Sequence, residues 1–235
     1  MALNHYALAE NPPRNAANER QNVNWNRSQP IENPEPGSHI ARCFAIIDLG
    51  TQQHSFNGEV WSSRDVRISF ELPNERMTGK YNADVKGKPF ASSVTLKQSL
   101  HPSSKMRKLL KSWRGRDFSK DELTTFEPKK LLGVPCRLTL VASPDGQYVN
   151  IDSIAPLGKG EKCPKQVNPS VYFSLDPDEF SFDVFNTLGE KTRTKIAGSP
   201  EFKALEDGGG SNEPDPEQLA ESAAAATEAE DDVPW

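Results

Sequence analysis

The chain has 235 residues and a net charge of −5, which is long enough for one substantial domain with tails. Its three cysteines are odd in number and widely spaced, without a CxxC or HxxxH pattern, which excludes a disulfide framework and a zinc motif. No apolar run approaches the roughly 18 residues of a membrane span, and the N-terminus does not resemble a signal peptide, so we expect a cytoplasmic protein without a membrane partner.

The charge is unevenly distributed along the chain. Residues 200–235 hold eleven acidic side chains and one basic side chain, whereas residues 39–199 hold 24 basic and 18 acidic ones. We therefore interpret residues 39–199 as a mildly basic folded domain and residues 200–235 as an acidic disordered tail. Residues 1–38 are rich in Asn, Pro and Glu, and we interpret them as a disordered or loosely packed arm.

The first predicted strand covers residues 39–50 and is apolar on both faces, which indicates that both faces are covered. Strict alternation would place the side chains at positions 41, 43, 45, 47 and 49 on one face. A polar loop is predicted over residues 51–64. An alternating strand follows at residues 65–72, where Pro73 is expected to end it, and a second loop runs from residue 74 to residue 89.

The next segment, residues 86–116, holds nine Lys or Arg residues and no Asp or Glu. Its pattern predicts a strand over residues 90–100 and then a helix over residues 103–113, with Gly115 as the C-cap. The basic side chains lie off the apolar stripe of the helix, so they are free to face a polyanion such as a nucleic acid. The alternative is a solvated helix face beside a charged edge strand.

The remaining elements are shorter. Ser119 and Glu122 have the spacing of a helix capping box. Two alternating strands at residues 134–142 and 148–154 flank a turn and predict a hairpin. We expect the segment that follows, up to residue 199, to wrap over the domain.

The order of three strands, a helix and two strands predicts a mainly β fold with minor α. We expect a five-stranded Greek-key barrel like the OB-fold, with the helix between strands three and four. An SH3-like barrel or a small α+β sandwich also fits the order of elements.

OB-folds bind single-stranded nucleic acid by stacking bases on aromatic side chains while cations follow the phosphates. The predicted loops and strand faces interleave these two residue types. The candidate nucleic-acid-binding residues are Arg42, Phe56, Trp61, Arg64, Arg67, Tyr81, Lys86, Lys88, Lys97, Lys105, Lys108, Arg114, Arg116, Arg137 and Tyr148.

The chain ends in two acids, an aliphatic residue, a proline and an aromatic residue: Asp231, Asp232, Val233, Pro234 and Trp235. Such an end offers a partner a free carboxylate and one large apolar anchor. It resembles the C-terminal tip of bacterial single-stranded DNA-binding proteins, which end in several Asp followed by Ile-Pro-Phe. The resemblance implies that the tail recruits replication or recombination proteins, such as a polymerase, a helicase or a nuclease.

The folded part, residues 39–199, is similar to a tailed-phage family of single-stranded DNA-binding proteins and not to the bacterial tetrameric ones. The resemblance lies in the segments ARCFAIIDLGTQ, DVRISFELP, KLLKSWRGRDFSKDEL and LLGVPCRLTLV. It implies a bacteriophage protein that protects single strands in the host cytoplasm during replication and recombination. We expect no enzyme and no cofactor, because the sequence has no nucleotide loop, catalytic triad or metal cluster. The alternative function is a phage structural or adaptor protein whose barrel binds a protein partner.

Overall fold

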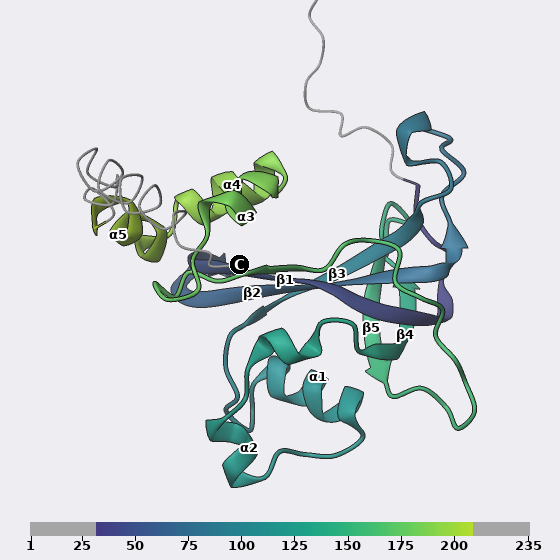
Figure 1. The fold of residues 1–235 in the computed structure, drawn as a ribbon, viewed down its shortest axis with the longest axis horizontal. Coiled ribbons are helices and arrows are strands. Elements are labelled where there is room, and N and C mark those ends of the chain that lie inside the picture. Colours follow the sequence, from purple (N-terminus) through teal and green to yellow (C-terminus); the bar gives the residue numbers. More distant parts are fainter. Residues whose placement is uncertain (1–31, 209–235) are drawn as a thin grey trace, which may run out of the picture.

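The structure, a computed structural model, describes residues 32–208, and the predicted partner-binding tip of the tail lies outside them. Within this range the protein is mainly β, as predicted, with strands in the order β3-β2-β1-β4-β5 and with β6 parallel to β1 (Figure 1). The strands are β1 (Gly37–Phe56), β2 (Glu59–Arg76), β3 (Pro89–Lys97), β4 (Pro135–Ala142), β5 (Val149–Ala155) and β6 (Val171–Phe173). The α-helices are α1 (Lys105–Arg114), α2 (Lys120–Thr124), α3 (Phe182–Thr187), α4 (Glu190–Ala197) and α5 (Pro200–Gly208).

β1 and β2 form one long hairpin, and the loop predicted over residues 51–64 is the outer half of that hairpin. The two strands remain paired from Thr51 out to Phe56. The turn residues Asn57 and Gly58 both have positive φ, of 50° and 84°, as a two-residue type I′ turn requires. The loop prediction was wrong. The polar side chains of residues 51–64 suggested a loop, but the Asn-Gly pair within them is a strong signal for a hairpin.

A register shift in β1 decides which of its side chains face each side of the sheet. The shift lies between Cys43 and Ala45, where β1 has one more residue than β2. Cys43 and Ile46 therefore pack into a first core, whereas Ile47 and Leu49 pack into a second core. The prediction that positions 41, 43, 45, 47 and 49 share one face was wrong, because a bulge reverses the alternation of side chains. The expectation that both faces of this strand are covered is confirmed.

The first core lies between the sheet and α1, which is below the sheet in Figure 1. Phe70 of β2 packs edge to face on Trp113 of α1, with 5.2 Å between the ring centroids. The indole N–H of Trp113 donates a hydrogen bond of 3.0 Å to the carbonyl oxygen of Pro135, so its polar atom is satisfied. Ser104 caps the first turn of α1, and Gly115 ends the helix as predicted, with φ of 70°.

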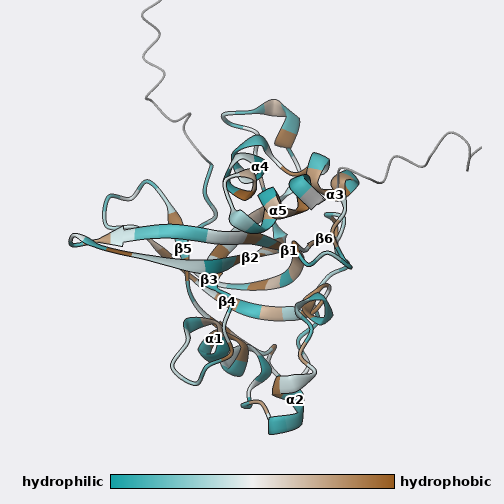
Figure 2. Ribbon diagram, turned by 90° about the vertical axis from the view of Figure 1, so that its left-hand side faces the viewer, coloured by the Kyte–Doolittle hydropathy of each residue, from teal (hydrophilic) through white to brown (hydrophobic). Residues whose placement is uncertain are grey.

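The second core lies on the opposite face, where the helices α3, α4 and α5 cover β1 and its neighbour β6 (Figures 1 and 2). Phe202 of α5 is buried among the aromatic rings of Phe180, Phe182 and Phe185. Burying such a side chain stabilises the fold by about 1.5–3 kcal/mol. The folded part therefore continues to residue 208, and the predicted boundary at residue 199 was wrong because Phe202 lies in a segment that is acidic in composition.

α5 also holds the root of the hairpin. The carboxylate of Glu201 accepts hydrogen bonds from the N–H (2.8 Å) and the hydroxyl (2.6 Å) of Thr51. Next to it, Gly50 has φ of 68°, and a Cβ on this glycine would lie 2.4 Å from the side chain of Ser199. The close approach of the two segments therefore depends on glycine at this position.

The N-terminal boundary lies earlier than predicted. The carboxylate of Glu32 accepts hydrogen bonds from the backbone N–H groups of Thr78 (2.6 Å), Gly79 (3.1 Å) and Lys80 (3.3 Å). β1 begins at Gly37. Residues 32–38 thus belong to the folded domain, where they fix the loop between β2 and β3.

The sheet is not closed. The edges of β3 and β5 are not paired with each other, and α1 contacts both strands. The helix follows β3 and precedes β4, as expected, but a closed barrel is not formed. Among residues 32–208, no helix is long and apolar enough to cross a membrane.

Candidate nucleic-acid interface

All six arginines named as candidates donate to groups of the protein itself. Arg42 donates to the carbonyl oxygens of Gly133 (2.5 Å), Pro164 (2.9 Å) and Cys163 (3.3 Å) and so ties two loops to β1. Arg64 pairs with the carboxylates of Asp48 and Asp176, and the hydrogen bonds that it donates to Asp48 in particular raise the pKa of its guanidinium. The other four pairs are Arg67 with Thr192, Arg114 with Glu122, Arg116 with Glu122, and Arg137 with Glu161. These arginines therefore all take part in contacts within the protein, although the side chain of Arg116 remains 62% exposed.

The basic segment is partly neutralised by two acids that lie just outside it. Arg107 and Lys111 pair with Asp117, while Arg114 and Arg116 pair with Glu122. Hydrogen bonds, first from Arg116 and then from the N–H of Ser119, lower the pKa of Glu122 to about 2. The N–H of Phe118 and the side chain of Arg107 lower the pKa of Asp117. Both acids are therefore ionised at neutral pH.

Five cations of the segment are exposed and have no ion pair within the part of the chain that the structure describes: Lys86, Lys88, Lys97, Lys105 and Lys108. They do not form one patch. Two lie in the loop before β3, one at the end of β3 and two on α1. Lys86, Lys88 and Lys97 lie at the two ends of β3, and the outer face of this strand is a better candidate for a binding surface than α1.

The lysine end of the sheet is formed by the loop of residues 77–88 and the turn of residues 143–148. Both are tied to the same short segment, because Glu32 holds the loop and Asn33 donates a hydrogen bond of 2.9 Å to the carbonyl oxygen of Gln147. The loop rises on the side of the sheet that carries α3 to α5 (Figure 1). Each segment presents one half-exposed tyrosine: Tyr81 (47% exposed), whose ring lies 5.0 Å from Lys80 Nζ, and Tyr148 (42% exposed). Aromatic rings and lysines thus gather at this end.

The outer face of β3 runs from the lysine end toward the root of the hairpin. Its side chains, at alternate positions, are small or polar and all exposed: Ala91, Ser93, Thr95 and Lys97. Sequence reasoning named only Lys97 among them. The signal in the sequence is the alternation of these small or polar residues with large apolar ones such as Phe90 and Leu96, which the structure buries. Such a face lets an extended chain lie close to the sheet between Tyr81 and Lys97.

The hairpin tip, residues 53–62, is the other aromatic surface. Phe56, Val60 and Trp61 are 69%, 62% and 47% exposed. The ring of Trp61 stacks on His54 at 5.6 Å between centroids. Unlike the lysine end, the tip contains no Lys or Arg, and its one formal charge is Glu59. Sequence reasoning named the two aromatic side chains but missed Val60, which lies beside the Asn-Gly turn.

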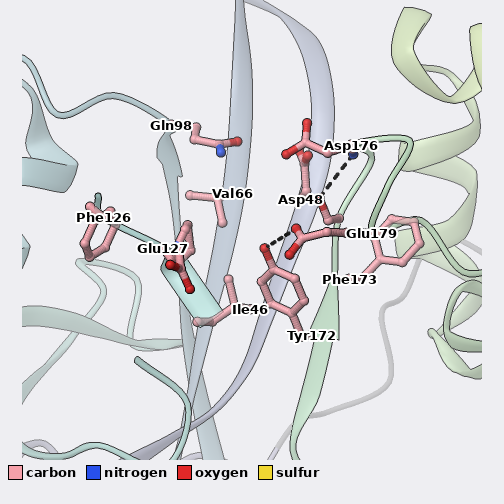
Figure 3. Close-up of a pocket in the computed structure, with 12 residues that line it drawn as sticks. Ile46, Asp48, Val66, Gln98, Phe126, Glu127, Tyr172, Phe173, Asp176 and Glu179 are labelled. Atoms are coloured by element: carbon pink, nitrogen blue, oxygen red, sulfur yellow. Dashed lines mark hydrogen bonds between the residues drawn. The ribbon is translucent and has the colours of Figure 1, made fainter. Parts of the chain in front are cut away.

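A cavity of about 190 Å³ lies between β1, β6 and the segment that follows α2 (Figure 3). Its lining includes four carboxylates: Asp48, Glu127, Asp176 and Glu179. The hydroxyl of Tyr172 donates to Glu179 (2.9 Å), and burial together with this carboxylate raises the pKa of the phenol to about 12. The acids of this cavity would repel phosphates, and Arg64 already neutralises two of them.

Within residues 32–208, no group of three or more His, Cys, Asp or Glu side chains is arranged to hold a metal ion. Comparisons of the chain with protein-family models, with curated proteins and with solved structures gave no match.

Proposed function

We propose that the protein binds single-stranded DNA, largely without sequence specificity, along the outer face of β3 and the lysine end. The strand order, with α1 between β3 and β4, supports an OB-type sheet that is left partly open. In that type of fold, the face of the second and third strands binds oligonucleotides together with the loops between strands one and two and between strands four and five, and the turn of residues 143–148 is the second of these loops here.

One observation carries the proposal. Exposed aromatic rings occur at the lysine end together with exposed lysines that have no ion pair within residues 32–208, and a polar strand face with small side chains adjoins them. Tyr81 would stack on a base, while the ammonium groups of Lys86 and Lys88 would contact phosphates at the lysine end and Lys97 would contact one several nucleotides away, at the far end of β3. Stacking is worth about 1–3 kcal/mol per base and accepts any base, because every base has a π face. The small side chains of β3 would let the strand approach without reading base edges.

The proposed role is protective and not catalytic. The protein would coat single strands during phage-type replication and recombination in the cytoplasm of the bacterial host. The acidic tail, with Asp231, Asp232, Val233, Pro234 and Trp235 at its end, would recruit a polymerase, a helicase or a nuclease. Replacing Trp235 by Ala should abolish such recruitment in a pull-down and leave the affinity for DNA unchanged.

The experiment is a fluorescence titration of the full chain with oligo-dT and with a duplex of equal length, at several salt concentrations. We expect a strong preference for the single strand. The double variant Lys86→Ala/Lys88→Ala should reduce the slope of log K against log salt by about 1.4, which corresponds to two lost phosphate contacts.

The control is Lys120→Ala/Lys130→Ala, which removes an exposed lysine of α2 and an exposed lysine after it that pairs with Glu127, and α2 lies on the α1 side of the sheet (Figure 1). It should leave the salt slope close to that of the natural chain. Equal, weak binding to oligo-dT and duplex would overturn the proposal and favour the adaptor function, in which the sheet binds a protein partner.

A further inference from the structure

The hairpin tip is an unusual surface, because it exposes large apolar side chains on a ribbon that has no third strand. The pairing of β2 with β3 ends at Asp65, and the pairing of β1 with β6 ends at Ile47. The root of the hairpin is fixed, since Gln52 donates to the carbonyl oxygens of Leu49 (2.6 Å) and Lys195 (3.2 Å). A two-stranded ribbon with an exposed apolar end is marginally stable in water, so a partner that covers the end would stabilise it.

The charge of the tip favours a protein partner over a nucleic acid. Residues 52–63 contain no Lys or Arg, and Arg64 is held by Asp48 and Asp176. Non-specific binding of nucleic acid depends on cations that neutralise phosphates. At the tip the only formal charge, that of Glu59, would repel them.

The same molecule carries an apolar cavity that suits such a tip. This seam cavity, of about 340 Å³, opens between the unpaired edges of β3 and β5 and is bordered by α1. Its apolar lining consists of Val94, Leu96, Leu109, Ile151 and Ile154. The charged groups around it are Lys105 and Lys108, which have no ion pair within the described chain, and Asp152, so the rim has a net charge of +1.

We infer that the hairpin tip of one copy of this chain inserts into the seam cavity of a second copy. Phe56 and Trp61, which share one face of the ribbon with Glu59, would cover the apolar lining, and Glu59 would lie between Lys105 and Lys108. A tip cannot fill the cavity of its own chain, because Val66, the β2 partner of Leu96, is seven residues from Glu59, or about 23 Å along the strand.

The contact joins two different surfaces, so each added copy leaves a free tip at one end and a free cavity at the other. Copies therefore add head to tail, in an open row unless the rotation between successive copies closes the row into a ring. The inference goes beyond the proposed binding of DNA and does not depend on it, since the tip and the cavity contact each other without nucleic acid.

The test is sedimentation velocity on the full chain, purified free of nucleic acid, over a range of concentrations. The weight-average mass of the natural chain should rise with concentration above the 26.0 kDa of one copy. The tip variant Phe56→Ser/Trp61→Ser and the cavity variant Lys105→Glu/Lys108→Glu should each remain at 26.0 kDa. Both replace exposed side chains, so circular dichroism should show that they fold.

Mixing the two variants gives the decisive result. The tip variant keeps an intact cavity and the cavity variant keeps an intact tip, so the mixture should form dimers and nothing larger. Combining Glu59→Lys with Lys105→Glu/Lys108→Glu in one chain should restore the concentration-dependent rise in mass.

Three results would overturn the inference. The natural chain could remain at 26.0 kDa at every concentration. The tip variant could lose association while the cavity variant keeps it, which would indicate a symmetric contact between two hairpins. Association could occur only in the variant Trp235→Ala, which would show that the end of the tail fills the cavity in the natural chain. A failure of DNA binding would leave all of these results unchanged.

Discussion

The two ends of the sheet both expose aromatic side chains, and they differ in the charges that surround those side chains. At the lysine end, Tyr81 lies in a loop with Lys80, Lys86 and Lys88. At the hairpin tip, Trp61 is equally exposed but has no free cation near it in the chain. An exposed ring alone therefore does not indicate a nucleic-acid site. The neighbouring cations separate a surface for bases from a surface for another protein.

The two ends also differ in how they are anchored. The hairpin root depends on the second core and α5, whereas the lysine end depends on residues 32 and 33. Changes to the second core should therefore affect the hairpin end first.

Loss of the buried ring in α5 should have the largest effect. Phe202→Ala removes a side chain that is packed against three other aromatic rings, and it should reduce the free energy of unfolding by about 3–5 kcal/mol. Thermal unfolding followed by circular dichroism measures the change. Phe182→Ala, at a half-exposed position beside it, is the control and should cost much less. Equal losses in the two variants would show that α5 does not support the hairpin end as described.

Substitution of one glycine at each end compares the stability of the two ends directly. Gly50 and Gly146 both have φ of 68°, but a Cβ on Gly50 meets Ser199 at 2.4 Å, while a Cβ on Gly146 has no atom within 4 Å. Gly50→Ala should cost about 2–4 kcal/mol from backbone strain plus overpacking, and Gly146→Ala about 1–2 kcal/mol from strain alone. Urea unfolding of both variants measures the difference. Similar costs would mean that Ser199 moves away without loss.

Single substitutions of the aromatic residues should separate the two ends by function. Tyr81→Ala should weaken binding of oligo-dT by about 1–3 kcal/mol, because one base loses its stacking partner. Trp61→Ala should leave that affinity nearly unchanged and reduce self-association instead. Titration and sedimentation of both variants provide the comparison. A larger loss of DNA affinity from Trp61→Ala than from Tyr81→Ala would reverse the assignment of the two ends.

The smallest effect should be a pH dependence at each anchor. The N–H of Thr78 lowers the pKa of Glu32 below its usual 4.5. Burial opposes ionisation of Glu201, but the hydrogen bonds from Thr51 outweigh it and lower that pKa as well. A carboxylate whose pKa is lower in the folded state stabilises that state fully above its unfolded pKa, and the stabilisation is lost as the pH falls through the folded pKa.

Both anchors should therefore hold at neutral pH and loosen below about pH 4.5. Hydrogen exchange of the Thr78 and Thr51 amides against pH measures this. In Glu32→Gln the protection of Thr78 should no longer depend on pH in that range, whereas the protection of Thr51 should still depend on it. A pH dependence of Thr78 that persists in the variant would assign the effect to another group.

The elements with strong local signals were predictable from the sequence. The amphipathic spacing of Met106, Leu110 and Trp113 and the C-cap Gly115 predicted α1, and Ser119 with Glu122 predicted the capping box that the structure contains. The β4–β5 hairpin was predicted for the same reason, since alternation and turn chemistry act over a few residues.

The features that failed depend on residues far apart in the chain. A bulge at Cys43 is set by pairing with β2, and the burial of Phe202 is set by rings brought from α3. Strict alternation over residues 65–72 places Glu71 on the outward face, but Glu71 is fully buried and accepts hydrogen bonds from the N–H groups of Val167 and Asn168 (both 2.8 Å). The internal partners of Arg42 were not predictable for the same reason, because the carbonyl oxygen of Pro164 lies 122 positions away in the sequence.

The second core has a consequence for the order in which the chain is made. Ile47 and Leu49 lie in the first third of the translated sequence, but their cover includes Phe202, more than 150 positions later. A growing chain must keep this apolar face of β1 in water until nearly all of the domain has left the ribosome. Pairings that span so much chain form slowly, and uncovered strands aggregate in the meantime. Synthesis that stops short of Phe202 would therefore release chains prone to aggregation, so yield in the cell should depend on chaperones that bind the face first.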